Sequence, residues 1–150
     1  MPNQRNQFDT KDCLERGERA ETQFARIAAR RGWKVTAAAS RQNIDEHWDV
    51  LIEQDAEQHR VDVKAMKRIS RRDAVPQDEW VWIELRGVRA GERGWLFGGK
   101  ADWLAFERAE SFVIVPRAAL AAPVLKTIDP KAMVSAPELA RYKVYQRPHR

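Results

Sequence analysis

Apolar residues recur with helical spacing in the first part of the chain. Placing successive residues about 100° apart puts four of them on one face: Ala20, Phe24, Ile27 and Ala28. Asp9 or Thr10 could cap such a helix, and Gly32 could end it. The spacing therefore predicts a helix over about 10–31, with Glu21 at the edge of its apolar face.

After Gly32 the pattern changes to short runs rich in β-branched and aromatic residues, which are typical of strands. We predict strands within 32–40, 47–54, 58–66, 80–85 and 111–115, a further apolar stretch around Asp102, and a short helix over 117–126 that breaks near Pro123. This order predicts one α/β domain with a mixed sheet. Residues 1–9 are expected to form a flexible tail, about 10–115 the core, and 116–150 a helical or irregular extension.

The polar stretch QDAEQ predicts a hairpin between the second and third strands. A turn centred between Asp55 and Ala56 places Asp49 directly opposite Asp62. Opposed residues have Cβ atoms about 4.5–5.5 Å apart, and two carboxylates at that separation repel by roughly 3 kcal/mol at an effective dielectric near 20. A divalent cation removes this penalty, because Mg²⁺ and Mn²⁺ prefer hard oxygen ligands. The register therefore predicts a shared metal site.

Lys64 follows Asp62 by two positions, so both side chains project from the same face of the strand. The opposite face is apolar and is expected to pack into the core through Val50, Ile52, Val61 and Val63. The Val63 carbonyl is well placed as a further oxygen ligand. Two metal-binding carboxylates beside a lysine suit phosphodiester hydrolysis, because the lysine can orient or deprotonate a water or stabilise developing charge.

The spacing from Asp49 through twelve residues to Asp62, Val63 and Lys64 resembles the PD-(D/E)XK nuclease superfamily. This resemblance implies a restriction-endonuclease-like αβββαβ core, a central mixed sheet flanked by helices, and a Mg²⁺-dependent deoxyribonuclease. It covers about 17–115. Trp48 stands where the family has proline, and the second acid is Asp rather than the commoner Glu.

The segment GERAETQFARIAARRGW resembles the family's first helix and assigns Glu21 to the metal site or its water. By the same analogy the chain would be an endonuclease, would act as a homodimer, and could be junction-resolvase-like. The segment GWLFGGKADWLAF resembles phage- or plasmid-encoded members. Asp102 is interpreted as a structural partner for a basic group, and Trp48 as a residue able to stack on a base.

Charge supports a polyanionic partner. The net charge is +5, and KAMKRISRR carries five cations and no acid directly after the candidate site. We expect phosphate contacts from Lys67, Arg68, Arg71 and Arg72. The chain has a single cysteine, Cys13, and it shows neither an apolar leader nor an apolar run of about 18 residues. We therefore expect a cytoplasmic protein without membrane contact.

Other interpretations remain open. Asp49, Asp62 and Lys64 could form a surface salt bridge on an exposed sheet face. The chain could instead be a DNA-binding module with a nuclease-like fold and no activity, or an interaction protein whose basic surface meets an acidic protein. The last predicts no metal binding and little salt-dependent affinity for DNA.

Overall fold

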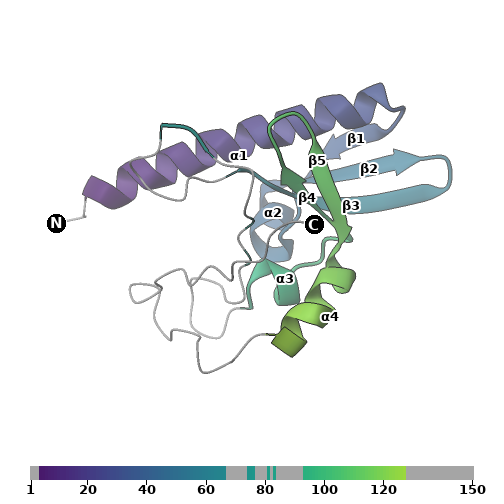
Figure 1. Cartoon of the computed structure of the whole chain (residues 1–150). Coiled ribbons are helices and arrows are strands. Elements are labelled where there is room, and N and C mark those ends of the chain that lie inside the picture. Colours follow the sequence, from purple (N-terminus) through teal and green to yellow (C-terminus); the bar gives the residue numbers. More distant parts are fainter. Residues whose placement is uncertain (1–3, 67–73, 77–80, 82, 84–92, 128–150) are drawn as a thin grey trace.

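The computed structural model describes residues 4–66, 74–76, 81, 83 and 93–127. These residues form a mixed α/β fold in which helices cover both faces of one five-stranded sheet (Figure 1). The elements in chain order are α1 (Gln4–Arg30), β1 (Lys34–Ala37), α2 (Ser40–Glu46), β2 (Val50–Gln54), β3 (Glu57–Lys64), α3 (Trp95–Gly98), β4 (Trp103–Glu107), β5 (Phe112–Pro116) and α4 (Arg117–Thr127).

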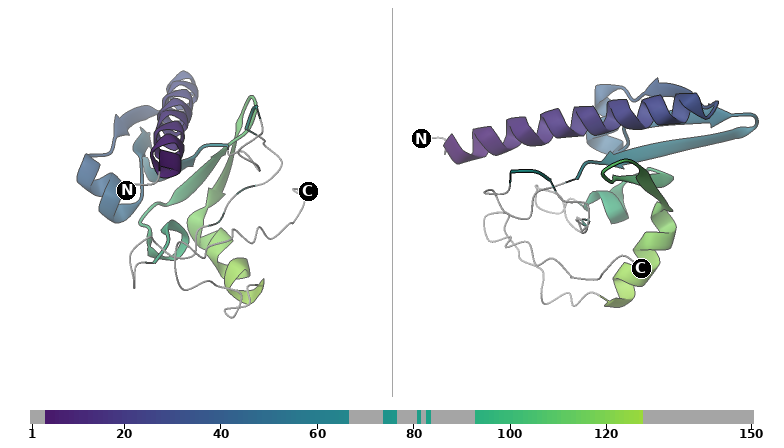
Figure 2. Two further views of the ribbon diagram at one scale, coloured as in Figure 1. Left: turned by 90° about the vertical axis from the view of Figure 1, so that its left-hand side faces the viewer. Right: turned by 45° about the horizontal axis from the view of Figure 1, so that its top comes forward.

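The first helix begins earlier than the sequence predicted. α1 starts at Gln4, so the expected flexible tail is helical from that residue. The prediction relied on apolar periodicity, which is weak before Thr10, and the residues from Gln4 to Asp9 include no proline or glycine that would disfavour a helix. The N-terminal part of α1 projects past the strands, as the right-hand view of Figure 2 shows.

The end of α1 confirms the predicted role of Gly32. Its φ is 87°, in the left-handed region that glycine adopts without a steric penalty. The Gly32 N–H donates to the Ala29 carbonyl at 3.0 Å, and the Trp33 N–H donates to the Ala28 carbonyl at 3.1 Å. This pair of bonds is a Schellman motif, which satisfies carbonyls at the helix end and turns the chain into β1.

The strands follow the order β1-β2-β3-β4-β5 across the sheet. All neighbours are antiparallel except β3 and β4, which are parallel. A parallel pair needs a crossover connection, and the chain between Lys64 and Trp103 supplies it with α3. β3 is therefore a central strand, and the candidate residues on it lie in the interior of the sheet.

The predicted hairpin register is correct. Leu51 pairs with Arg60 and Glu53 pairs with Gln58. The turn lies at residues 55 and 56, where Asp55 adopts a left-handed conformation with a φ of 52°. Aspartate tolerates this region better than most residues do. The hairpin therefore brings the start of β2 beside the end of β3.

Two apolar clusters fill the two faces of the sheet. Beneath α1, the predicted inward-facing valine and isoleucine positions of the hairpin pack against buried residues of the helix, namely Ala20, Phe24 and Ala28. The other cluster contains Trp95 and Leu96 of α3 with Leu104 and Phe106 of β4. Figure 2 shows α1 on one side of the sheet and α3 and α4 on the other. Both faces are thus covered, including the face that carries Asp62.

Three more helices differ from expectation, and one of them is α3, where no helix was predicted. α2 was not predicted, because the short sequence SRQNIDE has no apolar periodicity. α4 continues through Pro123 instead of breaking there. The predicted strand over 80–85 lies largely outside the described residues, although Val81 and Ile83 pack against the second cluster. None of the helices in the described ranges is long and apolar enough to cross a membrane.

Candidate active site

Asp62 is a charged side chain in the interior of the sheet. It lies in β3 with 4% of its surface exposed, opposite Leu104 of the parallel strand β4. Lys64 projects from the same face of β3, and its Nζ lies 2.8 Å from Asp62 Oδ2. Because Asp62 is buried, this ion pair differs from a surface salt bridge on an exposed sheet face: buried ions interact more strongly than exposed ones and are costly to leave unpaired.

Asp49 is held from two sides at the start of β2. Its Oδ2 accepts a hydrogen bond of 2.7 Å from the Val63 backbone N–H, and its Oδ1 accepts one from the Asn43 side-chain amide. The Asp49 N–H donates to the Val61 carbonyl at 2.9 Å. β3 and α2 together therefore fix the orientation of this carboxylate.

Glu21 joins the same group from the middle of α1. Its side chain is half-buried, and its pKa is raised to about 7. Burial is the largest cause, followed by the negative charge of Asp49 and a hydrogen bond with that carboxyl group. The structure thus brings Glu21 beside Asp49, as the resemblance implied, although the two residues are far apart in sequence.

The environment of Asp62 is unfavourable to its charged form. Burial raises its pKa to about 7, the Lys64 ammonium opposes that rise, and the Asp49 charge adds to it. Lys64 Nζ forms an ion pair with Asp62 Oδ2 at 2.8 Å. This buried oxygen therefore already has a cation beside it.

The three carboxylates do not form a ready metal cage. Among the described residues, no group of three or more His, Cys, Asp or Glu side chains is arranged to hold a metal ion. Both oxygens of Asp49 accept hydrogen bonds, and Lys64 lies against Asp62. The Asp62 carboxylate nevertheless has the oxygen chemistry that Mg²⁺ prefers, and a cation at its Oδ2 would take the place of the Lys64 ammonium.

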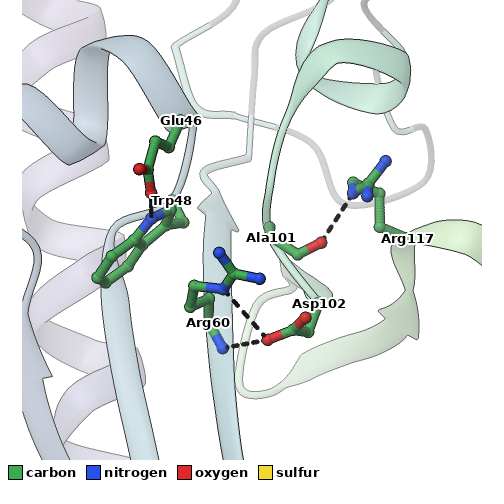
Figure 3. Close-up of polar contacts among 6 residues, drawn as sticks. All are labelled: Glu46, Trp48, Arg60, Ala101, Asp102 and Arg117. Atoms are coloured by element: carbon green, nitrogen blue, oxygen red, sulfur yellow. Dashed lines mark hydrogen bonds and ion pairs between the residues drawn. The ribbon is translucent and has the colours of Figure 1, made fainter.

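The interpretation of Trp48 as a base-stacking residue is wrong. Trp48 is buried with 6% exposure, and its indole N–H donates to Glu46 Oε2 at 2.8 Å (Figure 3). A ring packed in the interior cannot stack on a nucleotide. The neighbouring His47 forms the C-terminal cap of α2 and adopts a left-handed conformation with a φ of 54°.

Asp102 has the structural role that the sequence suggested, although it is not buried. Its Oδ2 accepts a 2.8 Å hydrogen bond from the Arg60 backbone N–H and lies 3.6 Å from the Arg60 guanidinium (Figure 3). The Asp102 N–H donates in return to the Arg60 carbonyl at 2.8 Å. These contacts fix the start of β4 against β3.

Two neighbours of the site were missed by sequence reasoning. Asn43 lies on the unpredicted helix α2, and Trp95 lies on α3 with its ring centroid 4.4 Å from Lys64 Nζ. The local pattern around Trp95 indicates only a core residue, and nothing in it marks the contact with Lys64. The expected phosphate-binding residues Lys67, Arg68, Arg71 and Arg72 lie outside the described residues.

Comparison with known proteins identifies no relative: no family model, no curated protein and no solved structure matches the chain.

Proposed function

We propose that the protein is a metal-dependent DNA endonuclease of PD-(D/E)XK type. The observation that carries the proposal is the ion pair of Lys64 with the buried Asp62, next to the anchored Asp49. A buried charge pair is costly to desolvate, and replacing it by apolar residues is often neutral or stabilising. A functional use of these charges accounts for their presence in the interior.

In this proposal Asp49 and Asp62 hold Mg²⁺, and Mn²⁺ substitutes for it. Glu21 and the Val63 carbonyl are the further oxygen ligands. Bound there, the metal would supply Lewis-acid polarisation of a phosphate and a lowered pKa for a bound water. Support for a cation here comes from the buried carboxylate of Asp62 beside Asp49, because carboxylate oxygens are the ligands that Mg²⁺ prefers.

The chain's own residues would prepare the reaction. Asn43 and the Val63 N–H keep the Asp49 carboxylate in one orientation. Lys64, with one quarter of its side chain exposed, would orient the attacking water or stabilise charge on the phosphate. Glu21, whose pKa is near 7, could accept or release a proton near neutral pH. The side chains of these four residues, Glu21, Asn43, Asp49 and Lys64, lie on helices and strands or directly beside one, and none lies on a long loop.

The order of elements supports the same proposal. The chain begins with a helix and continues with an antiparallel meander of three strands. A crossover then leads to a fourth strand that is parallel to the third. This order agrees with an αβββαβ arrangement. DNA as the partner rests on the basic segment after β3 and the net charge of +5. A homodimer is proposed only by analogy with nucleases that cut both strands.

The test is cleavage of a panel of DNAs with Mg²⁺, with Mn²⁺ and with EDTA. The panel contains supercoiled plasmid, linear duplex, single strand, flap and four-way junction. Wild type should cut at least one substrate with either metal and none with EDTA, and Asp62→Asn should cut none. Binding of DNA without cleavage by wild type would instead favour the non-catalytic DNA-binding module.

A further inference from the structure

The ammonium of Lys64 has a second neighbour besides Asp62. The centroid of the Trp95 ring lies 4.4 Å from Lys64 Nζ, within the range of a cation–π contact. Asp62 Oδ2 lies 2.8 Å from the same nitrogen. The ammonium is therefore held between a carboxylate on its own strand and an aromatic face from a distant segment of the chain, the crossover between β3 and β4.

Trp95 is itself firmly held. It is buried with 6% exposure and makes an edge contact with Phe106, at 6.3 Å between ring centroids. From α4, Arg117 donates to the Leu96 carbonyl at 2.9 Å and to the Ala101 carbonyl at 2.7 Å. α4 thus fixes both the short helix α3 and the chain that follows it.

Two glycines allow the tight turn that carries Trp95. A Cβ on Gly99 would collide with the Trp95 carbonyl oxygen, and one on Gly98 would lie 2.6 Å from the Arg93 Cβ. Real Cβ atoms do not approach other atoms so closely, so any larger residue would displace α3. The two glycines of the segment GWLFGG therefore allow the turn that carries Trp95.

We propose that Trp95 is a positioning residue that holds the Lys64 ammonium at Asp62 in the orientation needed for cleavage. An unbranched lysine chain has many rotamers, and two neighbours restrict it to one region. The role in cleavage rests on the proposed function, whereas the contact between Trp95 and Lys64 does not.

The contact is tested first by NMR of metal-free protein. Protons on Lys64 Cε should be shifted upfield by the ring current of Trp95, with Lys64→Arg providing the assignment. Trp95→Leu should remove the shift, and Trp95→Phe should retain most of it. Val115→Ala, which removes apolar packing from the same core cluster, is the matched control and should leave the shift unchanged.

Kinetics test the positioning role. Trp95→Leu should lower kcat about tenfold, the size expected for removing a partly desolvated cation–π interaction, with KM unchanged. Trp95→Phe should rescue most of kcat, and Trp95→Leu should have no further effect in a Lys64→Met background. A general packing defect would lower kcat equally in both backgrounds.

The outcomes separate the two claims. A wild-type Lys64 without an upfield shift overturns the inference, even if Trp95→Leu fails to fold. A shift with unchanged kcat in Trp95→Leu also overturns it. If wild type cuts no DNA, the proposed function fails, while the NMR result still decides whether Trp95 holds Lys64.

Discussion

Lys64 Nζ lies 2.8 Å from Asp62 Oδ2, and Asp62 is 4% exposed. Removing one partner of a buried ion pair leaves the other without compensation, so the two residues are energetically dependent on each other. The sequence predicted a role for Lys64 in chemistry, and the burial of its partner adds a role in stability. The pair should affect both.

Lys64→Met should lower turnover by about 10²–10⁴-fold, as for the removal of an acid–base or charge-stabilising group. At pH 8 it should also destabilise the metal-free protein by about 1–3 kcal/mol, because a buried carboxylate loses its counter-ion. At pH 5 the loss of stability should be smaller, since the Asp62 pKa of about 7 means that this group is already largely protonated. Chemical denaturation at both pH values measures the difference.

Lys34→Met provides the matched control for that experiment. Lys34 also pairs with a carboxylate, Glu53 at 3.8 Å, but 77% of the Lys34 side chain is exposed. Surface pairs of this kind contribute little to stability. Equal losses of stability for Lys34→Met and Lys64→Met would contradict the account of a buried, energetically coupled pair.

Stability without metal should fall as pH rises through the acidic range. Folding raises the pKa of Asp62 from 3.8 to about 7 and that of Glu21 from 4.5 to about 7. Between these values the folded state binds more protons than the unfolded state, so the free energy of unfolding decreases with pH. The stabilisation by these two carboxyl groups is fully present below pH 4 and is lost as the pH rises to about 7. Above that pH the two groups cause no further change in stability.

Melting temperatures in EDTA between pH 4 and 9 measure this effect. Asp62→Asn should flatten the profile, because it removes the carboxyl group whose pKa is raised. Asp45→Asn, on an aspartate that is 61% exposed, is the control and should follow the wild-type profile. A wild-type profile with the same slope as the Asp62→Asn profile between pH 4 and 7 would contradict the raised pKa of Asp62.

Asn43→Ala should weaken metal binding by roughly 10–100-fold, the range seen when residues that orient a ligand are removed. Asn43 donates to Asp49 Oδ1, so its removal lets the carboxylate rotate away from the site. Calorimetric titration with Mn²⁺ measures the change. Arg41→Ala, on the same helix and 93% exposed, should bind Mn²⁺ as wild type does. Identical affinities for all three proteins would show that α2 does not position Asp49.

The hairpin and its candidate residues were predictable because strand geometry is local. Side chains alternate along a strand, and a two-residue turn fixes the register, so Leu51 opposite Arg60 followed from residue numbers alone. The apolar stripe of α1 was equally local. It placed Glu21 at the boundary of the buried face without any knowledge of the tertiary fold.

The remaining features depend on contacts between distant segments. Trp95 reaches Lys64 only through the crossover between β3 and β4, and no local pattern encodes that contact. α2 has no apolar stripe, so Asn43 could not be assigned to a helix. The burial of Asp62 was also missed, because a second layer of helices covers a face that the sequence left unassigned. Sequence periodicity shows which face a residue takes, but not what covers it.

The basic segment after β3 supplies a prediction that rests on sequence alone. Replacing Lys67, Arg68, Arg71 and Arg72 by Ala should weaken binding to all DNA sequences alike. The slope of log affinity against log salt should shrink by roughly 0.9 for each duplex phosphate that the variant no longer neutralises. Fluorescence anisotropy across a salt series measures the slope. A slope that does not change would show that these cations make no phosphate contacts.

The central claim is that Asp49 and Asp62 share a divalent cation, and thermal melting at pH 8 with and without Mg²⁺ or Mn²⁺ tests it most directly. Wild type should gain about 2.7 kcal/mol of stability at a hundredfold excess of metal over its dissociation constant. Asp49→Asn and Asp62→Asn should each lose most of that gain. Asp55→Asn, which removes the same charge from the exposed hairpin turn, should keep it. The shared site would be contradicted if the melting temperature of wild type did not change with metal. It would also be contradicted if Asp49→Asn or Asp62→Asn showed the same change as wild type. Either result would remove the physical basis of the nuclease proposal.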